Sequence, residues 1–141
     1  MSAENRLGRL RKSLAENEID GILVSAPENR RYVSGFTGSA GYLLVSENDA
    51  VLATDFRYVE QAGLQAPGFR VERITSAYGW LTDLMSDMGV RRLGFEGHDL
   101  TVATHSALGK AIEESNAASS YDLVAVYGVI EELRAFKDSH E

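Results

Sequence analysis

The chain of 141 residues lacks several features that mark particular classes of protein. It contains no cysteine, which excludes disulfides, cysteine-ligated zinc and thiol catalysis. It has no run of about 18 apolar residues that could span a bilayer. Its N-terminal region also lacks the apolar stretch of a secretory signal peptide. We therefore expect a cytoplasmic protein with no membrane partner.

Positive charge is also in short supply. The chain has 14 Lys and Arg residues against 21 Asp and Glu residues, which gives a net charge of −7. Nucleic acids and anionic membranes bind clustered basic residues, so neither is expected as a partner. The one basic cluster is predicted to be the solvated face of an amphipathic helix near the N-terminus: Arg6, Arg9, Arg11 and Lys12.

The composition that is present is typical of a globular domain, with 44% apolar and 25% charged residues. The spacing of the apolar residues predicts an alternation of helices and strands. The predicted helices cover residues 3–17, 57–65, 78–88 and 101–115, with a single helical turn opening at Pro27 and ending near Gly35. The predicted strands cover residues 22–25, 41–46, 50–53, 69–72, 92–96 and 122–124.

This order of elements predicts the fold class. Two early strands joined by three polar residues, 47–49, form a hairpin, and strands and helices alternate after it. We expect one α/β domain with a mixed β-sheet and helices on both faces. Thr101 is the predicted N-cap of its helix. The helix over residues 78–88 places one set of apolar side chains on a single face for core packing: Trp80, Leu81, Leu84, Met85 and Met88.

A glycine-rich segment at residues 35–41 is the first candidate for a functional site. It is not a dinucleotide-binding fingerprint, because it precedes a strand where that motif needs a helix, and it is not a P-loop. It can be a flexible loop that feeds the hairpin, since glycine adopts positive φ at little cost. Alternatively, it is a loop whose backbone approaches a ligand or the active site of a partner. Phe36, an apolar ring between glycines, is its most suggestive residue.

Two further groups of polar residues are explained by structure alone. Asp55 is predicted to cap the helix that follows it, and Arg57 to pair with a carboxylate such as that of Glu60. No two of the three histidines have the spacing of a metal site, and Ser39 forms no evident triad with a distant His and Asp. The histidines are His98, His105 and His140.

The C-terminal stretch, residues 126–141, keeps a helical apolar spacing as far as Phe136 without a following cap. It is predicted to be a connecting helix that continues beyond Glu141. Residues 1–125 then form the domain, and residues 126–141 begin a connector to a catalytic domain. We expect the residues that carry out chemistry to lie in that further domain.

Five segments follow one another along nearly the whole chain and together resemble a known family: residues 20–24, 29–39, 54–62, 93–96 and 133–141. The most specific are Tyr-x-x-Gly-Phe at residues 32–36 and Thr-Asp-x-Arg-Tyr-x-x-Gln-Ala at residues 54–62. They resemble the N-terminal domain of the Xaa-Pro peptidase group, which includes prolidase, aminopeptidase P and creatinase. The fold that this resemblance implies is the mixed sheet with flanking helices already predicted.

The resemblance also implies where the chemistry lies. In that family a C-terminal domain holds two metal ions through two Asp, one His and two Glu residues. No cofactor is therefore expected in this chain, and two divalent ions (Mn, Co or Zn) are expected in the catalytic domain. The resemblance further implies a homodimer whose glycine-rich loop reaches the catalytic cleft of the partner. On this chain that loop consists of Phe36, Thr37, Gly38 and Ser39.

Creatinase-like members use an Arg from this domain to hold a substrate carboxylate, whereas Ser39 stands in the loop here. A peptide substrate is therefore favoured over creatine. The expected function is that of a non-catalytic N-terminal domain of an Xaa-Pro dipeptidase or aminopeptidase, which shapes substrate access and dimerisation. Alternatives are a stand-alone small-molecule-binding module or a dimerisation module without a peptidase domain. We expect Phe36 to affect kinetics and not stability.

Overall fold

The computed structural model describes residues 3–75, 78–115 and 121–135, which form six helices and six strands. The helices are α1 (Ala3–Glu16), α2 (Pro27–Ser34), α3 (Val59–Gln65), α4 (Gly79–Met88), α5 (Val102–Glu113) and α6 (Val129–Ala135). The strands are β1 (Gly21–Val24), β2 (Tyr42–Ser46), β3 (Ala50–Thr54), β4 (Arg70–Arg73), β5 (Arg92–Glu96) and β6 (Asp122–Val126).

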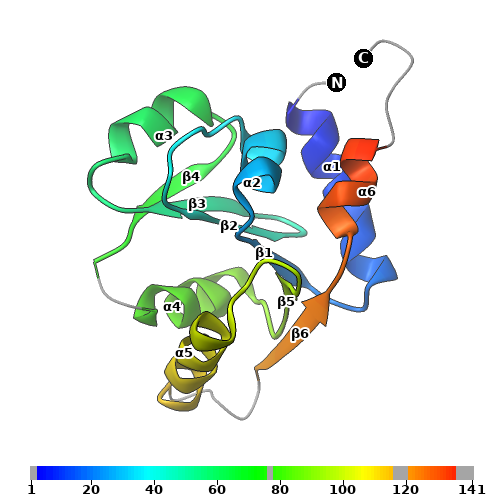
Figure 1. The fold of residues 1–141 in the computed structure, drawn as a ribbon, viewed down its shortest axis with the longest axis vertical. Helices are drawn as coiled ribbons and strands as arrows, with labels where there is room; N and C mark the ends of the chain where they lie inside the picture. The colour runs from blue at the N-terminus through cyan, green and yellow to red at the C-terminus, as the bar shows by residue number, and fades with distance from the viewer. Residues whose placement is uncertain (1–2, 76–77, 116–120, 136–141) are drawn as a thin grey trace.

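The six strands form one mixed sheet in the order β4-β3-β2-β1-β5-β6 (Figure 1). β2 pairs antiparallel with both β1 and β3, whereas the pairs β3–β4, β1–β5 and β5–β6 are parallel. Of the six strands, β2 alone is therefore antiparallel to the other five. The carboxyl ends of β1, β5 and β6 lie at the same edge, where polar groups from several elements can meet.

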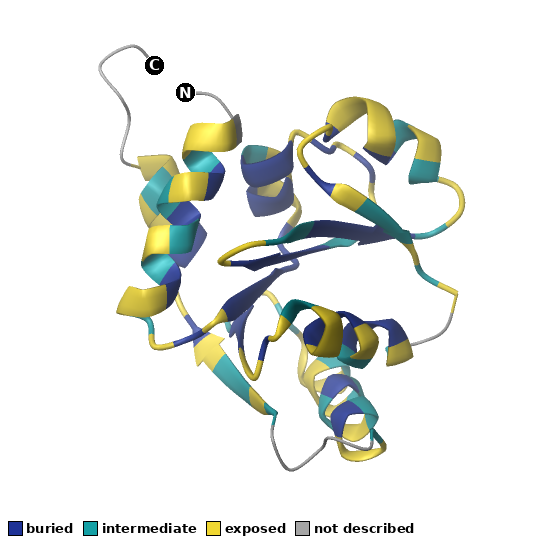
Figure 2. Cartoon of the chain, turned by 180° about the vertical axis from the view of Figure 1, so that it is seen from behind, coloured by how far each residue is buried: buried dark blue, intermediate teal, exposed yellow. Residues whose placement is uncertain are grey.

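Helices cover both faces of the sheet, as predicted. α1, α2, α3 and α6 lie on one face, and α4 and α5 lie on the other (Figure 1). The central strand β1 is buried on both sides: Ile22 and Val24 pack against the first group of helices, and Leu23 packs against the second. Such a strand is a continuous apolar run because neither face meets water. Figure 2 shows the central strands as the most buried part of the domain.

Most elements lie where the sequence predicts them. β5 has the predicted bounds, and β4 is a partly exposed edge strand. The hydroxyl of Thr101 accepts a hydrogen bond from the Thr104 N–H, so this predicted cap of α5 is confirmed. The predicted core face of α4 is confirmed for four residues that are buried: Trp80, Leu81, Leu84 and Met85.

The sequence underestimates α2, which has eight residues where a single turn was predicted. Pro27 stands in its first turn, where a missing N–H costs nothing, and Gly35 ends it in the left-handed conformation at φ 86°. At the other end of the chain, α6 packs against α1 and α2, and its Ile130 is fully buried. Residues 136–141 lie outside the described residues, so the division of the chain near residue 125 stays a prediction.

Candidate functional site

The glycine-rich loop at residues 35–41 joins the end of α2 to the start of β2. The N–H of Gly35 donates a hydrogen bond to the carbonyl of Arg31 at 2.8 Å. A side chain at position 35 would come close to the carbonyl of Gln65. Glycine is favoured there because the positive φ and the close approach both disfavour a Cβ atom. The loop therefore leaves α2 in one defined direction.

A buried arginine holds the loop from inside. Arg30 is 5% exposed, and its Nη1 donates to the carbonyl of Gly41 at 2.6 Å, while its Nη2 donates to that of Gly38 at 3.2 Å. A longer contact of 3.4 Å joins Nη1 to the carbonyl of Ser25. The hydroxyl of Thr54 donates to the carbonyl of Ala40 at 2.6 Å. Three carbonyls of the loop, those of Gly38, Ala40 and Gly41, are thus bound by side chains from α2 and β3.

The partners of the Arg30 guanidinium are backbone carbonyls and not carboxylates. None of the ion pairs seen in the described residues includes Arg30. Burial lowers the pKa of Arg30 from its usual value, although Asp99 and other neighbours oppose the change. Its Nε is buried and has no hydrogen-bond partner in the described structure. A charged group in this setting is costly unless it satisfies several acceptors, which Arg30 does with its two terminal nitrogens.

The four residues predicted to form a substrate-access loop divide into two buried and two exposed. Phe36 is 1% exposed and meets the ring of Tyr58 edge-on, with centroids 6.1 Å apart. Gly38 is buried beneath the ring of Phe36. Thr37 and Ser39 are exposed. The expectation that Phe36 would leave stability unaffected is therefore wrong, because its ring belongs to the core.

The exposed pair in the loop is bound to α3 and the turn before it. The N–H of Thr37 donates to the side-chain carbonyl of Gln65 at 2.9 Å, and Gln61 donates to the Thr37 hydroxyl at 3.1 Å. The hydroxyls of Ser39 and Tyr58 lie 2.6 Å apart. The structure thus brings together the segments at residues 29–39 and 54–62, which are separate in the sequence.

Asp55 does not cap the helix that follows it, so that prediction is wrong. α3 begins at Val59, with Tyr58 in the N-cap position and no side-chain hydrogen bond. Asp55 instead accepts from the backbone N–H of Arg57 at 2.9 Å and pairs with its guanidinium at 2.7 Å. Hydrogen bonding from the Arg57 side chain lowers the pKa of the Asp55 carboxyl. Arg57 thus pairs with a carboxylate as predicted, but not with Glu60, and an exposed pair of this kind adds little stability.

The packing of Gly38 under Phe36 makes a testable prediction. A Cβ atom at Gly38 would lie 2.1 Å from Cζ of Phe36, so the ring would have to move out of the core. We expect Gly38→Ala to lower the free energy of unfolding by about 1–3 kcal/mol. Gly63→Ala is the control, because nothing lies within 4 Å of the added atom and α3 should gain up to about 1 kcal/mol. Urea denaturation measures both, and equal responses of the two variants would contradict this packing.

A second cluster of polar groups lies at the carboxyl ends of β1, β5 and β6. Glu96, at the end of β5, is buried, and its Oε1 accepts hydrogen bonds from the N–H groups of Ser25 at 2.8 Å and Ala26 at 3.0 Å. Its other oxygen accepts from the side-chain amide of Asn29. Glu96 therefore joins β5 to the first turn of α2. A negative charge at this end of α2 also complements the helix dipole.

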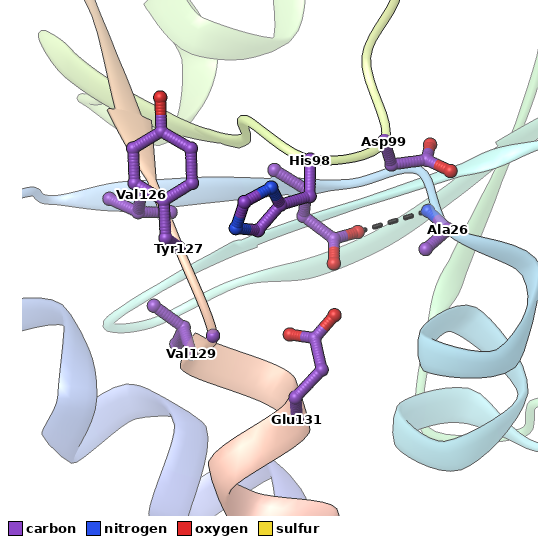
Figure 3. A pocket seen from close by; sticks show the side chains of 9 residues that line it. Ala26, His98, Asp99, Val126, Tyr127, Val129 and Glu131 are labelled. Atoms are coloured by element: carbon purple, nitrogen blue, oxygen red, sulfur yellow. Dashed lines mark hydrogen bonds between the residues drawn. The ribbon is translucent and has the colours of Figure 1, made fainter.

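Asn29 extends this network to α6. Its amide nitrogen lies 3.0 Å from Oε2 of Glu131, and its carbonyl accepts from Arg134 at 3.0 Å. Beside these groups is a hollow of about 170 Å³. Figure 3 shows His98 and Tyr127 on its wall and Glu131 projecting from α6. The network links α6 to α2, and α2 in turn leads into the glycine-rich loop.

Glu96 gives the stability a distinctive dependence on pH. Burial raises the pKa of the Glu96 carboxyl, and the charge of Glu131 adds to this effect, although the three hydrogen bonds oppose it. The folded state therefore holds the proton more tightly than the unfolded chain does. The contribution of Glu96 to stability is greatest below the unfolded pKa and decreases as the pH rises through the folded pKa.

We expect the unfolding free energy of the wild type, relative to Glu96→Gln, to decrease as the pH rises from about 4 towards neutrality. Urea titrations at several pH values measure this difference. Glu132→Gln, at an exposed position on α6, is the matched control and should show no such decrease. A difference between wild type and Glu96→Gln that stays constant, or increases, would contradict the assigned environment.

The histidines do not join either cluster in a way that forms a metal site. His98 packs against the ring of Tyr127, with centroids 4.8 Å apart, and His105 packs against Phe95 at 5.0 Å. His140 lies outside the described residues. Across the described ranges, no group of three His, Cys, Asp or Glu side chains could hold a metal ion. Nor does any helix in these ranges have the length and apolar character to cross a membrane.

The sequence did not identify Arg30, Asn29 or Glu96 as structurally important. One feature of the sequence could have pointed to Glu96: it is the last residue of strand β5, and functional side chains often lie at the carboxyl ends of parallel strands. No such feature points to Arg30, since Arg30 and Arg31 are adjacent and identical in type. Only the packed structure shows that the first is buried and the second exposed.

Comparison with known proteins was made for both sequence and structure. A family model, described as the creatinase/prolidase N-terminal domain, matches residues 6–136. The uncharacterized peptidase YqhT of Bacillus subtilis (strain 168) is 37% identical over 137 residues, which cover 96% of this chain and 37% of that protein. The chain thus spans little more than a third of the length of this curated relative.

Two solved structures are also similar. An Xaa-Pro dipeptidase from Bacillus anthracis superimposes with a TM-score of 0.89 at 35% identity, covering 99% of this chain and 38% of that one. The N-terminal domain of the cytoplasmic peptidase PepQ from Mycobacterium tuberculosis H37Rv superimposes with a TM-score of 0.81 at 41% identity, covering 92% of this chain and 98% of that one. The latter is a structure of an N-terminal domain alone.

Proposed function

Since this chain belongs to the creatinase/prolidase N-terminal domain family, we propose that it serves as the non-catalytic N-terminal domain of a cytoplasmic Xaa-Pro metallopeptidase. The similar B. anthracis protein is a dipeptidase of which the chain covers 38%. In this proposal a separate catalytic domain holds two divalent metal ions, which would activate a water molecule to attack the bond before proline. In the described residues, no three His, Cys, Asp or Glu side chains are grouped so that they could hold such an ion.

The role that we assign to this domain is to shape the entrance to the catalytic cleft of a second subunit. The observation that carries this role is the construction of the glycine-rich loop. Phe36 and Arg30 hold the loop firmly from the inner side, while Thr37 and Ser39 remain exposed on the outer side. A loop built in this way can contact a second surface without losing its shape. Closing the cleft would exclude water and limit the length of the peptide substrate.

Mixed dimers of the complete polypeptide test whether the loop acts on the partner. One subunit carries a wild-type loop and an inactivated catalytic domain, and the other carries Thr37→Gly and Ser39→Gly with an intact catalytic domain. If the loop acts across the dimer, this pairing should recover the wild-type KM for an Xaa-Pro dipeptide. The reverse pairing places both defects in one subunit, leaves the intact centre facing a variant loop, and should not recover it. Equal kinetics in the two pairings would refute action across the dimer.

The 141-residue chain by itself should have no peptidase activity. Isolated N-terminal domains of similar proteins have been crystallised, so the chain can be assayed as a separate domain. We expect no hydrolysis of Xaa-Pro dipeptides with Mn²⁺, Co²⁺ or Zn²⁺ at high protein concentration. Metal-dependent hydrolysis that follows the chain through successive columns would contradict the non-catalytic role.

A further inference from the structure

Arg30 and the exposed face of the glycine-rich loop are connected by the geometry of one peptide group. The Nη2 of Arg30 binds the carbonyl of Gly38 from the core side of the loop. In a planar trans peptide, the carbonyl of one residue and the N–H of the next point in opposite directions. The N–H of Ser39 must therefore point away from the buried guanidinium.

This N–H is available for binding. Ser39 is exposed, and its N–H donates to no acceptor in the described part of the chain. The N–H of Thr37, by contrast, is occupied by Gln65. The hydroxyl of Ser39 is held beside that of Tyr58, which keeps the residue from rotating freely. The loop thus presents one oriented backbone donor on its outer face.

We propose that Arg30 is a positioning residue that orients the Gly38–Ser39 peptide, so that the Ser39 N–H donates to a carbonyl or carboxylate oxygen of the bound peptide substrate. This inference rests on the proposed function, since it needs the loop to reach a substrate. Lysine cannot replace arginine fully in this role. The planar guanidinium reaches the carbonyls of Gly38 and Gly41 at once, whereas an ammonium is a single point on a flexible stem.

The two adjacent arginines of α2 provide a matched pair of variants. Arg30→Met removes the donors and keeps much of the volume, and Arg31→Met makes the same chemical change at an exposed position. In the 141-residue chain, ¹⁵N relaxation should show the order parameter of the Ser39 amide falling from about 0.85 to below about 0.6 in Arg30→Met. Arg31→Met should leave it unchanged, and the amides of β1 and β5 should stay rigid in both variants.

If Arg30→Met does not fold, Arg30→Lys gives the same information, because it keeps the charge but only one point of attachment. It should show a smaller loss of order at Ser39, with β1 and β5 still rigid. An unchanged Ser39 order parameter in the variant that folds would overturn the proposal. An equal loss of order in β1 and β5 would also overturn it, because Arg30 would then support the core in general.

Kinetics of the complete polypeptide test the second half of the proposal. Loss of one oriented hydrogen bond should raise the KM for an Xaa-Pro dipeptide roughly 2- to 10-fold in Arg30→Met, with little change in kcat. If Arg30→Met leaves KM unchanged while the Thr37→Gly and Ser39→Gly dimers show their expected asymmetry, the positioning role fails and the proposed function stands. If neither experiment affects KM, the proposed function of the loop fails, and the relaxation data still decide whether Arg30 orders it.

Discussion

Phe36→Ala is expected to lower the free energy of unfolding of the domain by about 3–5 kcal/mol. The ring is 1% exposed and belongs to the core cluster formed by α1, α2, α3, α6 and the sheet. Its removal would leave a cavity between Tyr58 and Gly38 and would remove the van der Waals contacts that the ring makes with them. The glycine-rich loop would then lose the packed side chain that supports it. Urea denaturation followed by circular dichroism measures the change.

Phe56→Ala is the matched control for this prediction, because the side chain of Phe56 is the same but 69% exposed. Its free energy of unfolding should change by no more than about 0.5 kcal/mol. A small effect in Phe36→Ala, comparable with that in Phe56→Ala, would mean that the Phe36 ring does not contribute to the core. If the expected loss of stability is found, the kinetics of Phe36→Ala in a complete enzyme must be interpreted together with that loss.

The elements of the sheet were predictable because each carries a local signal. Residues 22–25 are predicted to be a strand because they begin with three aliphatic residues in a row, which is typical of a strand buried on both faces. The observed strand β1 covers Gly21–Val24 and lies inside the sheet, between β2 and β5. The three-residue link after Ser46 defines the hairpin of β2 and β3. Thr101 caps α5 because its hydroxyl accepts a hydrogen bond from the backbone N–H of Thr104, three residues later in the chain. Each of these signals acts over a few residues and does not depend on the rest of the fold.

The loop could not be predicted to the same level. A ring flanked by glycines has no periodic pattern, and the burial of Phe36 depends on Tyr58, which is 22 positions away. Asp55 shows a related failure, because its carboxylate can bind either the start of a helix or the adjacent Arg57. The structure has the second arrangement, and α3 begins two residues beyond Arg57. Local propensity does not decide between two local partners of similar strength.

The burial of the charged residues Arg30 and Glu96 is even harder to predict from the sequence. Charged residues are usually exposed, and they are buried only when the fold supplies acceptors or donors. For Arg30 these are carbonyls of the loop, and for Glu96 they are N–H groups some 70 positions earlier in the chain. No local pattern encodes such pairings. Both residues act on α2, which therefore connects the network at α6 with the glycine-rich loop.

Glu96→Ala should therefore destabilise the domain by several kcal/mol, since about 1–3 kcal/mol is lost for each buried donor that is left unpaired. The affected donors are the N–H groups of Ser25 and Ala26 and the amide of Asn29. Glu60→Ala, at an exposed position on α3, is the control and should change stability by no more than about 0.5 kcal/mol.

The same variant should also loosen α2 before the sheet, because Glu96 holds the first turn of this helix onto β5. Hydrogen exchange in native conditions measures this local effect. In Glu96→Ala, the amides of α2 should lose more protection than those of β2 and β3, because the hydrogen bonds of Glu96 in the described structure go to Ser25, Ala26 and Asn29. A uniform loss throughout the domain would indicate that Glu96 supports global stability alone. Preferential loosening of α2 would show that a carboxylate on β5 controls the helix from which the glycine-rich loop begins.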